Sequence, residues 1–233
     1  MSKHLLIFTD IGDDIDDSLA ITHLVKHTSH TICAIVLTHG DIEHRHAEIT
    51  ALLEYLETSI PIIKGSSLPL AQHKEDTISQ DLLQHLPQHT PLTVLCLCAA
   101  TDLAKALMHM PALEKQIEHI WYQWTITTEN NQHVADLSSY NFRTDPEAIQ
   151  YCLSTGIPFS FITKQQAYAQ PRCEKEFLDF TDSPAINNYL LSKAYERQAR
   201  FKELNPTKQA EIYGHDATIL SFPYDLLVAK SVG

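Results

Sequence analysis

The sequence predicts an α/β fold with an open, mostly parallel sheet flanked by helices, and two observations support this. Short apolar runs rich in β-branched residues alternate with longer amphipathic stretches, which is typical of strand–helix–strand units around a parallel sheet. The 233 residues are enough to bury one substantial core, and no interdomain linker or internal repeat interrupts the pattern. We therefore expect a single domain over residues 1–233.

Six apolar runs are expected to be strands because each is short and rich in large or β-branched apolar residues. They are Leu5–Phe8, Thr31–Leu37, Pro61–Ile63, Leu92–Cys98, Ile117–Trp121 and Pro158–Ile162. Helices are expected at Asp16–Lys26, Glu43–Leu56, Thr101–Met108 and Asp145–Ser154. The last is the best delimited, since Asp145 suits the N-cap, Pro146 the first helical position and Gly156 the position after the end.

A longer helix is expected at Ala185–Leu204, with lysine and arginine on a side that faces solvent. The segments Leu70–Thr90 and Thr125–Leu137 are polar and carry histidine or asparagine. We expect these two segments to be loops or short helices at the mouth of a site.

Charge and composition exclude several functions. A net charge of −12 without a basic stripe makes nucleic acid an unsuitable partner. No run approaches the roughly 18 consecutive apolar residues of a membrane span, and the first apolar run is too short for a signal peptide. The five cysteines lack the spacing of a zinc site or a disulfide framework. We expect a cytoplasmic protein with reduced thiols and no membrane partner.

The chemistry concentrates where the first predicted strand ends. Five carboxylates lie within eight residues there, at Asp10, Asp13, Asp14, Asp16 and Asp17. Such crowding destabilises a fold unless a cation or a helix N-terminus neutralises it. Oxygen ligands, with no cysteine or histidine nearby in the sequence, favour calcium or magnesium, and several carboxylates on a loop favour calcium. A solvated N-cap cluster is the alternative interpretation of the same residues.

The run from Thr9 to Ala20 resembles the signature of the nucleoside hydrolase family, aspartate-x-aspartate-proline-glycine-x-aspartate-aspartate, in a variant with two extra residues before the final pair. Other segments resemble the family in the same order along most of the chain. They are Thr38–Asp41, Ile60–Gly65 with Pro69–Leu70, Leu97–Ala104, Tyr140–Ala148 and Gly214–Ala217. The sequence is thus identified as a short, divergent relative of the inosine-uridine preferring nucleoside hydrolases, which implies their Rossmann-like fold.

The resemblance implies calcium-dependent hydrolysis of the N-glycosidic bond of ribonucleosides to ribose and free base, in purine or pyrimidine salvage, by a homo-oligomer. A small-molecule nucleoside would be the partner. The implied calcium ligands are Asp10, Asp17, Asp216 and the backbone carbonyl of Leu97.

The resemblance also implies roles in catalysis and substrate binding. Asp10 would be the general base that takes a proton from water, and His215 the general acid that protonates the leaving base. The implied substrate-binding residues are Asp16, Asp41 and Asn141. Aromatic side chains that could stack on a base are Trp121, Tyr122, Trp124 and Tyr140.

Departures from the family pattern leave other functions open. Ser139 stands where the family has a glutamate that holds the ribose, and the chain stops soon after Asp216. A catalytically impaired relative that binds calcium and a ribosyl ligand without turnover is therefore the alternative. A phosphatase of the haloacid dehalogenase type is a third possibility, but its motif needs a second aspartate where this chain has Gly12.

Overall fold

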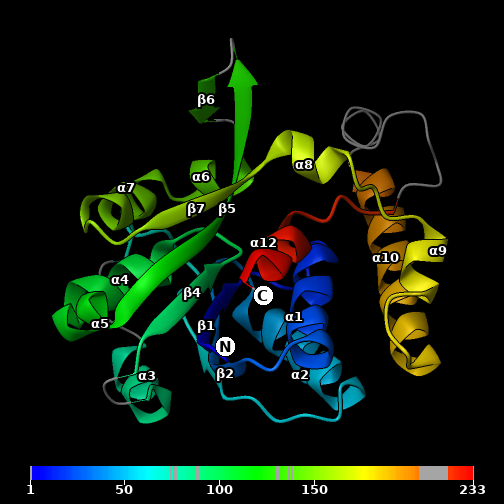
Figure 1. Ribbon diagram of the computed structural model, residues 1–233, viewed down its shortest axis with the longest axis horizontal. Coiled ribbons are helices and arrows are strands. Elements are labelled where there is room, and N and C mark those ends of the chain that lie inside the picture. The colour runs from blue at the N-terminus through cyan, green and yellow to red at the C-terminus, as the bar shows by residue number, and fades with distance from the viewer. Residues whose placement is uncertain are drawn as a thin grey trace.

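The computed structural model describes residues 2–73, 75, 78–87, 90–129, 132–135, 137, 139–204 and 220–232. Its centre is a sheet whose parallel strands follow the order β3-β2-β1-β4-β5-β7, with β6 antiparallel to the outer part of β5 (Figure 1). The strands are β1 His4–Thr9, β2 Thr31–Leu37, β3 Ile62–Lys64, β4 Leu92–Cys96, β5 Ile117–Glu129, β6 Gln132–Ala135 and β7 Phe159–Thr163. The predicted open, mostly parallel sheet is confirmed.

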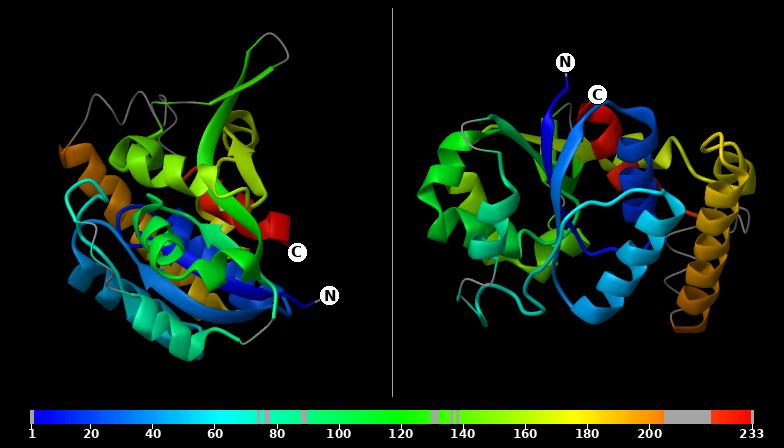
Figure 2. Two further views of the ribbon diagram at one scale, coloured as in Figure 1. Left: turned by 90° about the vertical axis from the view of Figure 1, so that its left-hand side faces the viewer. Right: turned by 90° about the horizontal axis from the view of Figure 1, so that it is seen from below.

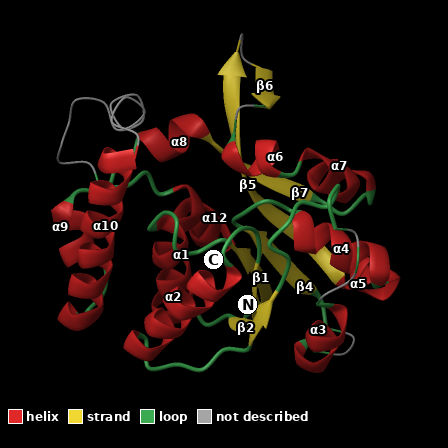
Figure 3. Cartoon of the chain, turned by 180° about the vertical axis from the view of Figure 1, so that it is seen from behind, coloured by secondary structure: helices red, strands yellow, loops and turns green. Residues whose placement is uncertain are grey.

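Helices cover both faces of this sheet. In the described parts of the chain they are α1 Asp16–His27, α2 Ile42–Tyr55, α3 Ser79–His85, α4 Thr101–His109, α5 Pro111–Gln116, α6 Tyr140–Thr144, α7 Pro146–Ser154, α8 Lys164–Tyr168, α9 Glu174–Leu178, α10 Pro184–Leu204 and α12 Tyr224–Val232. Figure 3 shows α1, α2 and α12 on one side of the sheet and α4, α5 and α7 on the other. None of the described helices combines the length and the apolar character needed to cross a membrane.

The strands are buried on both faces, which is why they read as continuous apolar runs. Leu6 and Phe8 of β1 belong to the core beneath α4, α5 and α7, whereas Leu5 and Ile7 belong to the core beneath α1, α2 and α12. Side chains on a strand alternate between faces, so a single apolar run serves both cores.

Most expected elements lie within a few residues of their observed bounds. Asp145 caps α7 as predicted, because its Oδ1 accepts a hydrogen bond of 3.1 Å from the backbone N of Ala148.

Four of the five cysteines are buried and all are free thiols. The segment Leu70–Thr90 contains the short helix α3, as expected.

The interpretation of Thr125–Leu137 as loop or short helix was wrong. β5 continues to Glu129 and pairs with β6, so the two strands form a hairpin that projects beyond the sheet (Figure 2). Threonine and isoleucine at residues 125–128 favour extended backbone, and pairing with β6 satisfies backbone groups beyond Tyr122, where the pairing with β4 ends.

The parallel strands β1, β2 and β4 all end at one edge of the sheet. Ligand sites of open α/β sheets lie beyond this carboxyl edge. The acidic cluster of the sequence follows β1 directly, so the fold places it where a ligand site is expected.

Candidate active site

The carboxylates of the acidic run are buried beyond the end of β1. Asp10 follows the strand, and Asp16 and Asp17 form the first turn of α1, with exposures of 7%, 7% and 3%. Thr9, the last residue of β1, donates a short hydrogen bond from its hydroxyl to Oδ1 of Asp17. The strand end and the helix start therefore hold these side chains inside the protein rather than in solvent.

A further carboxylate comes from the other end of the chain. Asp225, in the first turn of α12, is 2% exposed, and its carboxylate lies with those of Asp16 and Asp17 so that one oxygen of each is within 4.8 Å of the others. α12 packs beside α1 (Figure 1). The site therefore joins residues from both ends of the chain.

The sequence analysis did not predict Asp225. It assigned the late carboxylate to Asp216 and the acid to His215, and both residues lie outside the part of the chain that the structure describes. A signal was available, because Asp225 comes just before the apolar run Leu226–Ala229, much as Asp17 comes just before the apolar run Leu19–Ile21. Both are acidic residues at the start of an apolar helix, where the helix dipole favours negative charge.

Neighbouring carboxylates dominate the electrostatics of Asp16 and Asp225, while Arg45 places a positive charge near Asp10 and Asp17. Burial raises the pKa of Asp10 to about 6, although the nearby Arg45 acts against this. Burial and the charges of neighbouring carboxylates raise the pKa values of Asp16, Asp17 and Asp225 well above their usual range. One carboxylate oxygen of each of Asp16, Asp17 and Asp225 lies within 4.8 Å of the others, so in the absence of a cation these groups tend to keep protons.

A hard divalent cation would replace those protons. The charge of Asp10 acts on Asp16, Asp17 and Asp225, so all four groups belong to one electrostatic unit. Buried carboxylate oxygens without sulfur or imidazole ligands are the donor set that calcium and magnesium prefer. Within the described residues, Asp16, Asp17 and Asp225 are the one group of three side chains arranged to hold a metal.

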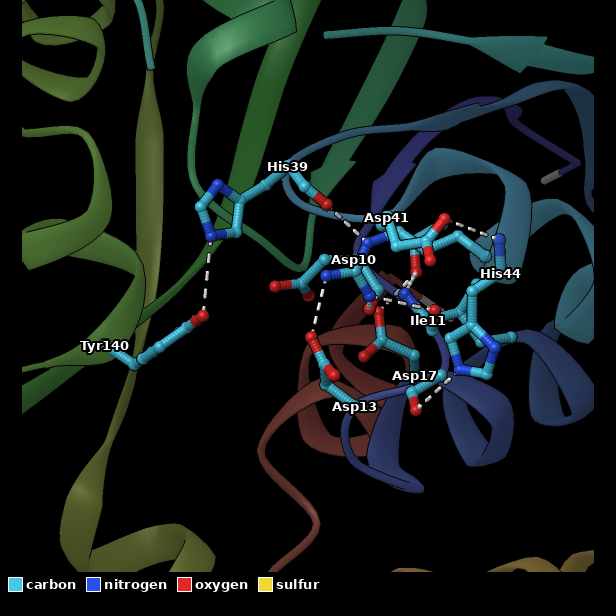
Figure 4. A network of polar contacts seen from close by, with 11 residues as sticks. Asp10, Ile11, Asp13, Asp17, His39, Asp41, His44 and Tyr140 are labelled. Atoms are coloured by element: carbon cyan, nitrogen blue, oxygen red, sulfur yellow. Dashed lines mark hydrogen bonds and ion pairs between the residues drawn. The ribbon is translucent and has the colours of Figure 1, made fainter. Parts of the chain in front are cut away.

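Arg45 of α2, which the sequence analysis did not single out, supports the loop that carries Asp10. Its side chain is 3% exposed, and its Nη1 donates to the carbonyl oxygens of Asp10 and Ile11, the latter at 3.0 Å. Its Nε donates to the carbonyl oxygen of His39 at 2.5 Å. One guanidinium therefore joins the loops after β1 and β2, whose residues Asp10, Ile11 and His39 are labelled in Figure 4.

The structure gives Asp13 and Asp14, unassigned from the sequence, different surroundings. Burial opposes ionisation of Asp13, but its 2.7 Å ion pair with Arg45 prevails and lowers its pKa. Burial raises the pKa of Asp14, against the charge of Arg197. A cavity of about 130 Å³ lies beside these two residues and is lined in part by Arg197 and Arg200 of α10. The charged side of α10 therefore faces the acidic loop.

Two predicted site residues touch each other. The side-chain Nδ2 of Asn141, in α6, donates to the carbonyl oxygen of Leu97 at 3.2 Å, just beyond β4. Asn141 is 5% exposed. The predicted neutral metal ligand and the predicted substrate amide therefore lie together. Asp41 instead caps α2, because its Oδ1 accepts from the backbone N of His44 at 3.0 Å.

The aromatic residues named from the sequence divide between core and site. Tyr122 is fully buried, and Trp121 packs against the core under α1. Trp124 lies among residues whose side chains the structure does not describe. Tyr140 is 53% exposed and lies near Asp10. The partial burial of Tyr140 and, to a smaller extent, the negative charge of Asp10 raise the pKa of the Tyr140 hydroxyl. Ser139, which precedes it, is buried.

Comparison with known proteins supplies independent evidence for the family of this chain. A model of the inosine-uridine preferring nucleoside hydrolase family matches residues 5–224. No curated protein sequence matches the chain.

Several solved structures share the fold. An inosine-guanosine nucleoside hydrolase is 16% identical, with a TM-score of 0.74 over 98% of this chain and 78% of its own. An inosine-uridine preferring nucleoside hydrolase from Bacillus anthracis is 17% identical, with a TM-score of 0.67 over 100% of this chain and 82% of its own. The type III effector XopQ, complexed with adenosine diphosphate ribose, is 17% identical, with a TM-score of 0.72 over 98% of this chain and 80% of its own.

Proposed function

Because the chain belongs to the inosine-uridine preferring nucleoside hydrolase family, we propose that it hydrolyses the N-glycosidic bond of ribonucleosides to ribose and free base with bound calcium. The observation that carries this proposal is the buried carboxylate cluster beyond β1, which is crowded and offers only oxygen ligands. We further propose that the chain is one domain and acts in the cytoplasm, in purine or pyrimidine salvage, as a homo-oligomer.

The proposed calcium ligands are Asp10, Asp17, the carbonyl of Leu97 and one late carboxylate. We assign the late carboxylate to Asp225 because it is buried against Asp16 and Asp17. Calcium, when bound there, would hold the ribose hydroxyls and polarise a water. Asn141 would steady the Leu97 carbonyl through its 3.2 Å hydrogen bond while its amide oxygen remains available to the sugar.

Asp10 would take the proton of the attacking water. Burial raises the pKa of this carboxylate in the metal-free protein, which favours a basic group at this position. Asp16 would accept a hydrogen bond from the ribose, and the buried carboxylates together would stabilise the positive charge that develops on the sugar. His215 remains the proposed acid for the leaving base, and Asp41 a proposed substrate contact.

The test is release of free ribose from a panel of purine and pyrimidine ribonucleosides, with calcium and with a chelator. We expect the chelator to abolish release and Asp10→Ala to reduce kcat by at least about a hundredfold. Asp182→Ala, at an exposed aspartate away from the cluster, is the matched control and should leave the rate unchanged. Ribose release that ignores both the chelator and Asp10→Ala would refute the mechanism.

A second function is a relative that binds calcium and a ribosyl ligand without turnover. Ser139, in place of the family's ribose-holding glutamate, favours it, and the effector XopQ shows this fold complexed with adenosine diphosphate ribose. Calcium-dependent binding of adenosine diphosphate ribose by calorimetry, with no ribose released from any nucleoside, would select this alternative.

A further inference from the structure

His39, in the loop after β2, holds an unusual backbone conformation. Its φ of 62° lies in the left-handed region, where a side chain approaches the following carbonyl. Its backbone N donates to the carbonyl oxygen of Ser66 at 2.6 Å, and its own carbonyl accepts from Arg45. Gly40 follows with a φ of 74°, so glycine serves the turn at one position while histidine is kept at the other. Strained non-glycine residues of this kind cluster at functional sites.

The imidazole of His39 faces Tyr140 directly, beside the carboxylate cluster. Nε2 of His39 lies 3.5 Å from the hydroxyl of Tyr140, and the rings meet edge to face with centroids 6.3 Å apart. A contact of 3.5 Å is at the long limit of a hydrogen bond and is easily exchanged for a ligand. Nδ1 of His39 is buried and has no hydrogen-bond partner among the described residues. The protein therefore does not fix the tautomer, and Nε2 can either donate or accept.

The pair stands beside the carboxylates that would hold the ribose. Figure 4 shows His39 and Tyr140 together on one side of Asp10 and Asp13. Tyr140 comes from α6, directly before Asn141, and more than half of its surface is open to solvent. The sugar end of the site is lined with carboxylates, so this pair is the aromatic surface that the described residues offer next to it.

We propose that His39 and Tyr140 bind the heterocyclic base of the substrate, with Nε2 of His39 as the hydrogen-bonding atom and the Tyr140 ring as a stacking surface. This inference rests on the proposed nucleoside hydrolysis and makes His39 a specificity-determining residue. A base presents ring nitrogens and carbonyl oxygens that accept, and N–H groups that donate. A histidine of unfixed tautomer can match either kind, whereas a plain aromatic leaving group gains nothing from it.

The experiment compares ribonucleosides with p-nitrophenyl β-D-ribofuranoside, whose leaving group departs without a hydrogen bond from the protein. We expect His39→Ala to lower kcat/KM for nucleosides by at least about tenfold and for the nitrophenyl riboside by less than about threefold. Tyr140→Phe, which keeps the stacking surface, should stay within about threefold of wild type, while Tyr140→Ala should lose at least about tenfold. His85→Ala, at an exposed histidine of α3, is the control.

Two further measurements separate ligand binding from folding and from the proposed function. His39→Gly removes the side chain and relieves the left-handed backbone, so it should match His39→Ala in activity with an equal or higher Tm. Binding of the free bases adenine, hypoxanthine and uracil is measured by calorimetry for wild type and His39→Ala.

Each outcome decides the inference. Equal losses on both substrates in His39→Ala would overturn it. If the wild-type protein cleaves neither substrate, the proposed hydrolysis is refuted. The base site is then still supported if the free bases bind to wild type and the substitution His39→Ala weakens this binding at least about tenfold. Base binding that is absent, or that His39→Ala leaves unchanged, would overturn it.

Discussion

Arg45 of α2 reaches into the loop after β1 and forms an ion pair in which its Nη2 lies 2.7 Å from Oδ2 of Asp13. The guanidinium is buried, whereas the carboxylate is 45% exposed. Asp13 lies between Gly12 and the final pair Asp16 and Asp17, where the motif is longer than the family's, so the ion pair gives this longer loop a structural role. The same guanidinium also hydrogen-bonds the carbonyls of Asp10 and Ile11.

Arg45→Met should lower the free energy of unfolding by about 3 kcal/mol, because it leaves buried carbonyls without donors and removes a buried charge partner. Chemical denaturation measures this loss. Lys64→Met is the matched control, since Lys64 pairs with Glu43 at an exposed position and its loss should stay within about 1 kcal/mol. Equal losses in the two variants would contradict the role of Arg45.

Asp225→Asn should weaken calcium binding at least about a hundredfold, because it removes a buried carboxylate from the cluster. The same change should stabilise the calcium-free protein, since it relieves repulsion with Asp16 and Asp17. Calorimetry with calcium and thermal unfolding with chelator measure the two effects. Asp216→Asn tests the sequence-based assignment, and a larger loss of affinity there than in Asp225→Asn would restore it.

In the calcium-free protein, the contribution of Asp10 to stability should decrease as the pH rises from about 4 to about 6. Asp10 has a pKa of about 6 in the folded protein, against 3.8 for an ordinary aspartate such as that of the unfolded chain. Proton binding by Asp10 therefore stabilises the folded protein fully at low pH, and this contribution disappears as the pH rises to about 6. Calcium replaces the proton, so the Tm difference between calcium and chelator should widen over the same interval.

His23, whose pKa burial lowers to about 4, acts in the opposite direction, but equally in both conditions. The difference in Tm between calcium and chelator therefore isolates the cluster. A difference that stays constant between pH 4 and pH 7 would contradict the assignment of the raised pKa values to the calcium site.

Gly65→Ala should destabilise the protein by about 3 kcal/mol or more, because the added Cβ would lie 2.3 Å from Oδ2 of Asp102 and 2.5 Å from the carbonyl oxygen of Leu37. Asp102 is itself fixed there by hydrogen bonds from Thr38 and from the backbone N of Ser66. Gly156→Ala is the control. Its Cβ would enter open space, so only its φ of 81° should matter, at about 1 kcal/mol.

The fold could be predicted from the sequence because burial on both faces gives each central strand a continuous apolar run. β2 has the expected bounds, Thr31–Leu37, and the other strands expected from the sequence are displaced by a few residues or extended. The hairpin of β5 and β6 could not be predicted in this way. It projects beyond the sheet, and residues 125–128 are mostly threonine rather than a continuous apolar run.

The residues of the candidate site could also be predicted only in part from the sequence. Asp10, Asp16 and Asp17 are neighbours in sequence, so a local motif identifies them. Arg45 and Asp225 reach the cluster only through the packing of α2 and α12, and a lone arginine or aspartate on a helix is ordinarily solvated. The sequence therefore predicted the site residues that are close together in the chain, but not those that tertiary packing brings to the site.

The pairing of α1 with α12 also bears on how the chain folds. Asp16 and Asp225 are separated by almost the whole polypeptide, so closing the carboxylate cluster demands one of the longest-range contacts in the molecule. Contacts of such long sequence separation form slowly, because the entropy of loop closure must be met before they give any stability. Calcium affinity would then appear only in molecules that have completed this last docking step, and calcium would favour native chains over partly folded ones.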